Sequence, residues 1–132
     1  MNKEFVPYEQ ALELKELGFD EPCIACYDKL NMLATYSENL FEPKNYNTSG
    51  YCVSSPLYQQ AFRFFREKYK LYGSYGQTND NREEVNGFVI GNFINGMRNR
   101  LFADWEVGTY EEAELACLDK LISILKEQQN GK

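Results

Sequence analysis

The sequence predicts a single α+β domain in which an antiparallel sheet packs against helices. Three observations lead to this class. Apolar residues recur at helical spacing in three separate stretches, and Asn95-Gly96 stands between two strand-like runs, which is typical of a tight hairpin. A chain of 132 residues is also about one domain in length. We expect the order α-β-β-(long loop)-α-β-β-β-α over residues 1–132.

The first helix is expected to begin at Pro7, because proline is tolerated at the first helical position. Apolar residues at helical spacing continue it to Leu17. Gly18 ends it, and Phe19 should fold back on the last turn in a Schellman motif.

Two short apolar runs follow, Cys23 to Tyr27 and Met32 to Tyr36, and they predict a hairpin with a four-residue connection. Ser37 to Tyr51 is then the longest irregular segment. Its aromatic residues, Phe41, Tyr46 and Tyr51, indicate that part of it packs back on the core. Whether this segment binds a ligand is left open.

The second helix is expected from Ser55, as N-cap before Pro56, to about Lys70. Its predicted buried face comprises Tyr58, Ala61, Phe62, Phe65 and Tyr69, with Leu57 and Phe64 at the margin. The opposite face carries a narrow stripe of candidate binding residues, Gln59, Arg63, Arg66 and Lys70. Such a stripe is either a solvated face or a site for phosphate or an acidic partner.

A strand is expected from Leu71 to Gln77, then a polar loop from Thr78 to Glu84. Phe88 to Ile94 and Met97 to Trp105 should form a hairpin around Asn95-Gly96, because a type I′ turn needs positive φ at both positions. Gly91 should mark a bulge or a close approach of another group.

The last helix begins with a predicted capping box, Thr109 and Glu112, in which the hydroxyl and the carboxylate each accept a backbone N–H. Its apolar arc comprises Tyr110, Ala113, Cys117, Leu118, Leu121, Ile122, Ile124 and Leu125. The arc is broad enough to be held from two sides, and it leaves room for a homodimer contact. Glu111 and Glu114 fall inside that arc, where a charge must be paired or lie at the rim. They are secondary site candidates, and stabilisation of the helix N-terminus is the simpler explanation.

The chemical inventory argues against an enzyme. The chain contains no histidine, so the usual proton shuttle near neutral pH is missing, and no phosphate-binding or dinucleotide motif is present. Cys23 and Cys26 have the spacing of a metal or redox pair, but no second such pair follows, so we expect small buried thiols and neither a metal nor a cofactor. Paired carboxylates, such as Asp104 and Glu106, are expected to be solvated.

The net charge of −6 is unevenly distributed, since residues 51–100 contain seven basic and four acidic side chains. This pattern favours a protein partner over a strongly basic nucleic-acid surface. Tyr72 and Tyr75 are the remaining candidates for base stacking, although a strand would place them on opposite faces.

The second half follows the element order of double-stranded RNA-binding domains. Those domains contact RNA with basic residues at the start of their last helix. Here the matching positions are Glu111, Glu112 and Glu114, which would repel phosphate. The RNA interpretation is therefore disfavoured.

Four segments of the chain, which fall into three blocks, are residues 5–9 and 17–23, the helix at 58–69, and the helix start at 109–114. In these segments the chain resembles small uncharacterised proteins encoded by tailed phages and by gut Bacteroidetes genomes. The resemblance implies a phage or mobile-element product that acts inside a bacterial cell, and it brings no site residues with it.

Our leading hypothesis is a non-enzymatic phage-type interaction protein that binds a macromolecular partner, as an inhibitor or regulator. The alternatives are a nucleic-acid-binding module and a binder of a small anionic ligand such as a nucleotide. No membrane association is expected, and the absence of an apolar leader segment predicts a location in the bacterial host cytoplasm.

Overall fold

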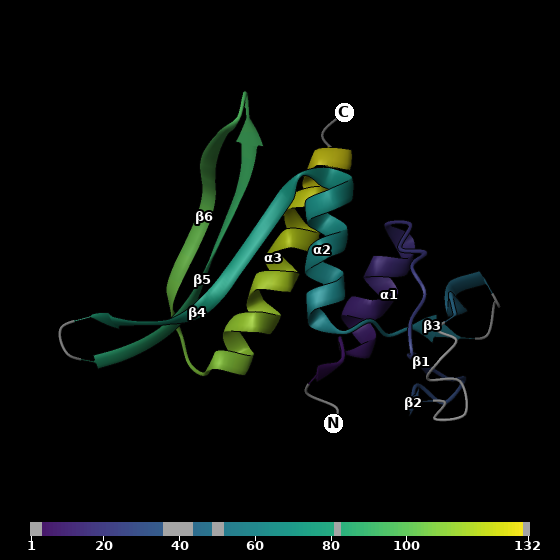
Figure 1. Ribbon diagram of the computed structural model, residues 1–132. Coiled ribbons are helices and arrows are strands. Elements are labelled where there is room, and N and C mark those ends of the chain that lie inside the picture. Colours follow the sequence, from purple (N-terminus) through teal and green to yellow (C-terminus); the bar gives the residue numbers. More distant parts are fainter. Residues whose placement is uncertain (1–3, 36–43, 49–51, 81–82, 131–132) are drawn as a thin grey trace. The chain divides into compact units, whose positions relative to one another are not determined.

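The computed structural model (Figure 1) describes residues 4–35, 44–48, 52–80 and 83–130. In chain order, its elements are α1 (Tyr8–Glu16), β1 (Ala25–Tyr27), β2 (Leu33–Thr35), η3 (Tyr46–Thr48), β3 (Val53–Ser54), α2 (Tyr58–Tyr69), β4 (Leu71–Asp80), β5 (Glu83–Ile94), β6 (Met97–Val107) and α3 (Tyr110–Asn130). The predicted α+β class is confirmed, and the predicted order roughly matches. The additions are the short strand β3 and the 3-10 turn η3. Among the described residues, no helix has the length and apolar character needed to cross a membrane.

The chain divides into two compact units, Met1–Ala61 and Phe62–Lys132, with the division falling within α2. Each unit has its own three-stranded antiparallel sheet, where one sheet was expected. The assignment of residues 1–132 to one domain stays a prediction.

The sheet of the first unit has the order β2-β1-β3. The predicted hairpin is confirmed, because Tyr27 pairs with Leu33 and Cys26 with Ala34. Asp28 organises the connection: its carboxylate accepts the N–H groups of Leu30 and Met32 at 2.9 and 3.1 Å. Asp28 to Met32 therefore form the turn. Met32, which was expected to begin the second strand, belongs to the turn.

The Schellman motif at the end of α1 is confirmed. Gly18 has φ 91°, its N–H donates to the Lys15 carbonyl at 3.1 Å, and the Phe19 N–H donates to the Leu14 carbonyl at 2.9 Å. This geometry buries the Phe19 ring. Pro7 is the N-cap residue of α1, so the helix begins one residue later than predicted.

The predicted N-cap role of Ser55 is wrong. Its side chain is fully buried, and its hydroxyl donates to the Val6 carbonyl at 2.9 Å. α2 begins only at Tyr58, and the first helical hydrogen bond runs from the Ala61 N–H to the Leu57 carbonyl. The Ser55 side chain thus makes a tertiary contact within the first unit, and does not cap the helix as the local sequence predicted.

Much of the predicted long loop, including Phe41 and Tyr51, lies outside the described residues. Its described part is held by polar contacts. The Asn47 amide donates to the Phe19 carbonyl and accepts the Ser54 N–H, both at 2.8 Å, and the Tyr46 N–H donates to the Ser54 hydroxyl at 2.8 Å.

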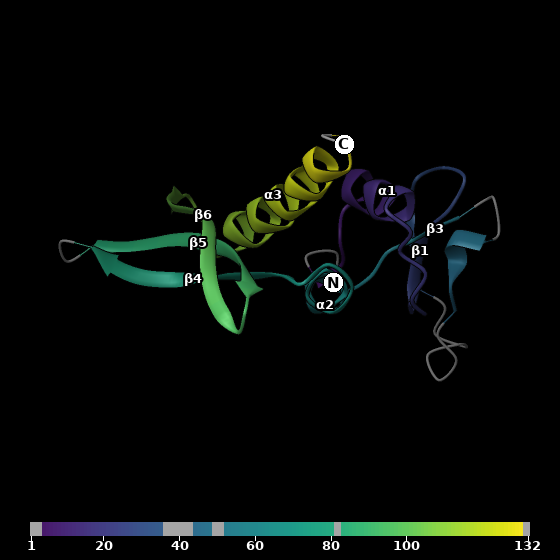
Figure 2. The same cartoon turned by 90° about the horizontal axis from the view of Figure 1, so that it is seen from above.

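The sheet of the second unit has the order β4-β5-β6, and α3 lies across one of its faces (Figure 2). β4 and β5 pair from Leu71 with Asn92 as far as Asp80 with Glu83. The polar loop predicted from Thr78 to Glu84 is therefore wrong in extent, because most of that segment continues the two strands.

The hairpin around Asn95-Gly96 is confirmed, with Ile94 paired to Met97 and positive φ values of 53° and 79° at the two turn residues. The predicted irregularity at Gly91 is also confirmed. The register shifts between Ile90 and Gly91, and the Tyr72 hydroxyl lies where a side chain of residue 91 would project. This bulge decides which side chains of β6 face α3.

α3 buries Ala113, Cys117, Leu118, Leu121, Ile122 and Leu125, most of the predicted arc. Ile124 is half-buried and Tyr110 is 44% exposed, so these two lie at its margins. At Gly73 of β4, a Cβ would meet the side chains of Cys117 and Leu121. The absence of a side chain at Gly73 therefore allows α3 to approach β4 closely.

The Thr109 hydroxyl accepts the Glu112 N–H at 3.1 Å, as predicted for an N-cap. The same hydroxyl donates to the Glu112 carboxylate at 3.1 Å, so this carboxylate accepts the hydroxyl and not the backbone N–H that the capping box predicted. On α2, Phe64 is 4% exposed and belongs to the buried face, not to its margin as predicted.

Candidate functional site

The predicted basic stripe lies on α2, with Gln59, Arg63 and Arg66 exposed. Lys70 follows the helix in the left-handed region, with φ 59°, and its ammonium donates to the Glu67 carbonyl at 3.1 Å. Lys70 therefore helps to end the helix, which explains part of the stripe by local structure.

The structure brings together two other predicted residues, Tyr75 on β4 and Glu114 on α3. The Tyr75 hydroxyl donates a 2.5 Å hydrogen bond to the Glu114 carboxylate. Aromatic rings surround this contact: the Tyr75 ring centroid lies 5.2 Å from that of Phe62 and 5.4 Å from that of Tyr110. Tyr75 is thus a packed partner of α3 and does not present a free ring for stacking.

The electrostatics of this pair follow from its position between α3 and β4. Burial raises the pKa of Glu114, the Tyr75 hydrogen bond opposes that rise, and the Glu111 charge adds to it. Burial and the neighbouring Glu114 carboxylate also raise the pKa of Tyr75. Glu111 itself is exposed at the helix start, so the two glutamates have different environments.

Tyr72 lies on the other face of the sheet, as the alternation of a strand predicts. Its ring contacts Phe93 at a centroid distance of 5.4 Å, and the Arg98 guanidinium lies 4.7 Å from its centroid. Because Arg98 covers the Tyr72 ring, this tyrosine is also less available for stacking than the sequence suggests.

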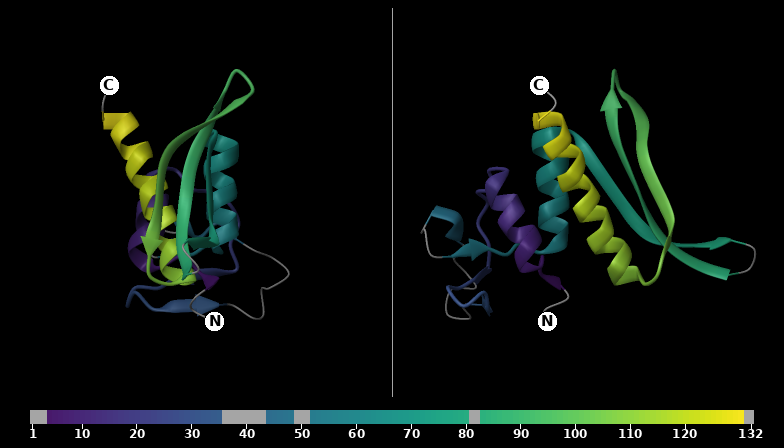
Figure 3. Two further views of the ribbon diagram at one scale, coloured as in Figure 1. Left: turned by 90° about the vertical axis from the view of Figure 1, so that its left-hand side faces the viewer. Right: turned by 180° about the vertical axis from the view of Figure 1, so that it is seen from behind.

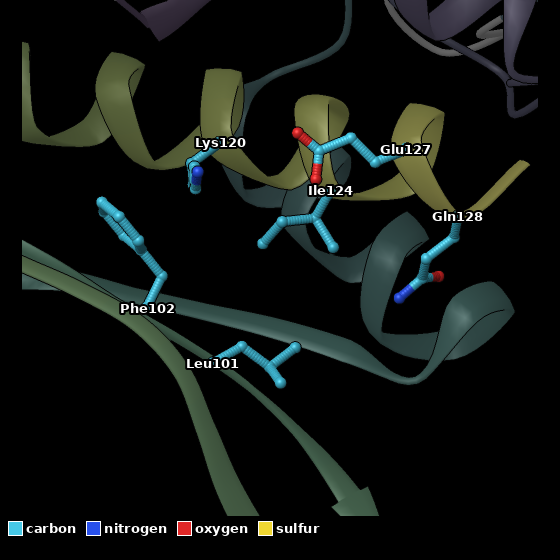
Figure 4. A pocket seen from close by; sticks show the side chains of 6 residues that line it. All are labelled: Leu101, Phe102, Lys120, Ile124, Glu127 and Gln128. Atoms are coloured by element: carbon cyan, nitrogen blue, oxygen red, sulfur yellow. The ribbon is translucent and has the colours of Figure 1, made fainter. Parts of the chain in front are cut away.

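Sequence reasoning missed a groove between α3 and β6 in the second unit (Figure 4). One hollow of about 390 Å³ is lined by Leu101, Phe102, Lys120, Ile124, Glu127 and Gln128. A second, of about 350 Å³, adjoins it at Phe102 and Lys120 and is also lined by Phe88, Asp104, Ala116, Asp119 and Ser123. We call these two hollows together the α3–β6 groove.

The bulge in β6 creates the floor of this groove. Ile90 pairs with Phe102 and Gly91 with Arg100, so Leu101 is an extra residue on β6. Leu101 and Phe102 both line the same hollow, although an ideal strand would direct them to opposite faces. Gly91 in the sequence was the available indication of this arrangement.

The groove has an apolar floor and an acidic rim. Its lining contains three carboxylates, Asp104, Asp119 and Glu127, and one ammonium, Lys120. The Lys120 ammonium lies 4.4 Å from the centroid of the Phe102 ring, so it makes a cation–π contact with the floor of the groove. The lining therefore favours an occupant that combines apolar and basic side chains.

The end of the β5–β6 hairpin is unusually apolar for an exposed segment. We define residues 93–101 as the hairpin tip. Its exposed apolar residues are Phe93, Ile94, Met97 and Leu101, with exposed fractions of 51%, 54%, 71% and 44%. Figures 1 and 3 show this hairpin diverging from α3 towards the tip. The tip also carries Arg98 and Arg100, and no Asp or Glu occurs from Val85 to Ala103.

Cys23, Cys26 and Cys117 are buried and form no disulfide, and the burial of Cys23 and Cys26 was predicted. Burial raises the pKa of Cys23 and of Cys117 to about 12. Across the described part of the chain, no group of three or more histidine, cysteine or acidic side chains is placed to hold a metal ion.

Comparison with known proteins gives no relative to guide the assignment. No family model, no curated protein and no solved structure matches the chain.

Proposed function

We propose that this chain is a non-enzymatic, phage-type interaction protein that binds a protein partner through the hairpin tip and thereby acts as an inhibitor or regulator. The observation that carries the proposal is the set of exposed apolar side chains on residues 93–101, among which Ile94 and Met97 pair across the two strands. Exposed apolar surface of this kind is typical of a site of association. Two further features support a binding role over catalysis. The chain contains no histidine, and Tyr75 and Glu114 are hydrogen-bonded to each other.

The charge of the tip indicates the kind of partner. Arg98 and Arg100 are its two charged side chains, and both are exposed. Arginine combined with large apolar residues is enriched at protein interfaces, where each anchor enters a pocket on the partner. An apolar surface with acidic surroundings is the expected complement.

Quantitative capture from a bacterial lysate tests this assignment. Immobilised wild-type protein should retain a defined protein, and Ile94→Glu and Met97→Glu should each lose it, because a charge replaces an apolar anchor. Arg63→Glu/Arg66→Glu is the matched control on α2 and should retain the partner. Capture that depends on the α2 arginines and survives the tip substitutions would contradict the proposal.

The alternative is binding of nucleic acid or of a small anionic ligand on the α2 stripe. It is supported by the exposure of Arg63 and Arg66 on one helix. This alternative predicts salt-sensitive retention of RNA or DNA, or a rise in melting temperature with nucleotides, and loss of both in the Arg63→Glu/Arg66→Glu variant.

A further inference from the structure

We propose that the hairpin tip of one copy binds in the α3–β6 groove of a second copy, so that two copies exchange tips in a symmetric dimer. This inference rests on the proposed function in taking the tip as a binding surface. It goes further by naming the occupant and the surface that receives it.

The groove and the hairpin tip match in shape and in apolar character. The groove has a floor of Leu101, Phe102 and Ile124 between a helix and an edge strand (Figure 4). A hairpin end presents a narrow ridge of side chains from two strands about 5 Å apart. Insertion of Ile94 and Met97 would remove exposed apolar surface from both partners, which is the main favourable term in association.

The groove and the tip carry opposite charges. The groove lining carries three carboxylates and one ammonium, whereas the tip carries no acidic residue and two arginines, on the hairpin face opposite to Ile94 and Met97. Asp119 and Glu127 lie eight residues apart in the sequence, and both line the groove from α3. Opposite charges of this kind set the orientation of an interface and disfavour wrong pairings.

The tip and the groove lie next to one another on the same unit. Leu101 belongs to the tip and also lines the groove, so donor and acceptor surfaces adjoin one another within the second unit. A two-fold axis beside them lets each copy donate a tip and receive one, and every contact then forms twice. In this closed dimer both apolar tips are covered, and further copies do not add to form an open chain.

Charge exchange tests the dimer. Molar mass by light scattering should show a wild-type dimer at about 100 µM, a range in which weak specific dimers form. Arg98→Glu/Arg100→Glu and Asp119→Lys/Glu127→Lys should each weaken the dimer at least about tenfold. The combination of all four substitutions should restore it, because the two signs are exchanged. A monomeric wild type, or four substitutions that fail to restore association, would overturn the inference.

Two further measurements guard against misfolding and against another dimer. Met97→Glu changes a side chain that is 71% exposed, so it should disrupt the dimer while leaving the melting temperature of the monomer unchanged. In a mixture of Met97→Cys and Gln128→Cys proteins, oxidation should join residue 97 of one copy to residue 128 of the other. Cross-links confined to identical residues would reject tip-in-groove docking.

These results also separate the inference from the proposed function. A monomeric wild type that still captures a foreign protein through Met97 would overturn the dimer and leave the proposed function intact. If the wild type captures no foreign protein but forms a dimer that responds to charge exchange, the dimer is supported and the proposed function is contradicted. Groove substitutions on α3 are the discriminating variants, because they leave the tip itself unchanged.

Discussion

Tyr75 and Glu114 join the sheet of the second unit to α3 through a 2.5 Å hydrogen bond, with the tyrosine hydroxyl as donor. Both residues were site candidates on sequence grounds, for unrelated reasons. Their contact explains why a glutamate falls within the apolar arc of α3. It also removes Tyr75 from the set of rings available for binding.

Tyr75→Phe should lower the free energy of unfolding by about 1 to 2 kcal/mol near neutral pH, because Glu114 loses a charge-assisted hydrogen bond in a partly desolvated position. Urea denaturation checks this value. In a Glu114→Gln background the same substitution should cost less, since the acceptor is then neutral. An equal cost in both backgrounds would mean that packing, not this hydrogen bond, explains the loss.

Glu114 should make stability depend on pH. Burial raises its pKa above the ordinary value of 4.5, so the folded chain keeps this proton at pH values where the unfolded chain has lost it. The free energy of unfolding should therefore fall as pH rises from the unfolded to the folded pKa. Glu114→Gln should remove this slope, whereas Glu16→Gln, which changes an exposed carboxylate of α1, should keep it. Identical pH profiles for wild type and Glu114→Gln would contradict the assignment.

Gly76 and Gly87 pair across β4 and β5 but differ in their surroundings. A Cβ at Gly87 would overlap the Trp105 ring and the Asp104 carbonyl, whereas a Cβ at Gly76 meets nothing within 4 Å. Gly87→Ala should cost about 2 kcal/mol or more, and Gly76→Ala should gain roughly 0.5 kcal/mol. Thermal unfolding measures both, and an equal effect would show that Trp105 does not pack on Gly87.

Ser55 and Tyr27 share one acceptor, the Val6 carbonyl, and each donates to it at 2.9 Å. Ser55→Ala or Tyr27→Phe should each cost about 1 kcal/mol, because the other donor still satisfies the carbonyl. The double variant leaves this acceptor without either donor and should cost more than the sum. Additive losses in chemical denaturation would show that the two donors act independently.

The thiols should differ in reactivity. Since the pKa of Cys23 and of Cys117 is raised to about 12, almost none of either thiol is ionised near neutral pH, and both side chains are buried. Cys52 is partly exposed and should take up the first equivalent of iodoacetamide. Peptide mapping locates the label, with Cys52→Ser as the control that should react slowly. Early labelling of Cys117 would contradict its position on the buried face of α3.

The motifs that depend only on neighbouring residues were predicted correctly from the sequence. Gly18 and Phe19 formed the expected Schellman motif, Asn95-Gly96 formed the turn, and Thr109 capped α3. Each of these features is decided by residues within a few positions of one another.

The predictions were wrong where a residue distant in the sequence competes for the same side chain or backbone group. Ser55 has the composition of an N-cap, but the Val6 carbonyl takes its hydroxyl. The polar segment from Thr78 to Glu84 resembles a loop, yet long cross-strand pairing keeps most of it in β4 and β5. A one-residue register shift at Gly91 directs Leu101 into the groove, and alternation of side chains cannot anticipate that shift.

The central claim is that the hairpin tip is the binding surface, and site-specific photo-cross-linking tests it most directly. A photoreactive residue in place of Met97 should yield a protein adduct of one defined mass, and the same residue in place of the exposed Gln59 should not. An adduct of twice the chain mass would identify a second copy. Adducts formed only from position 59, or adducts removed by nuclease, would contradict the account.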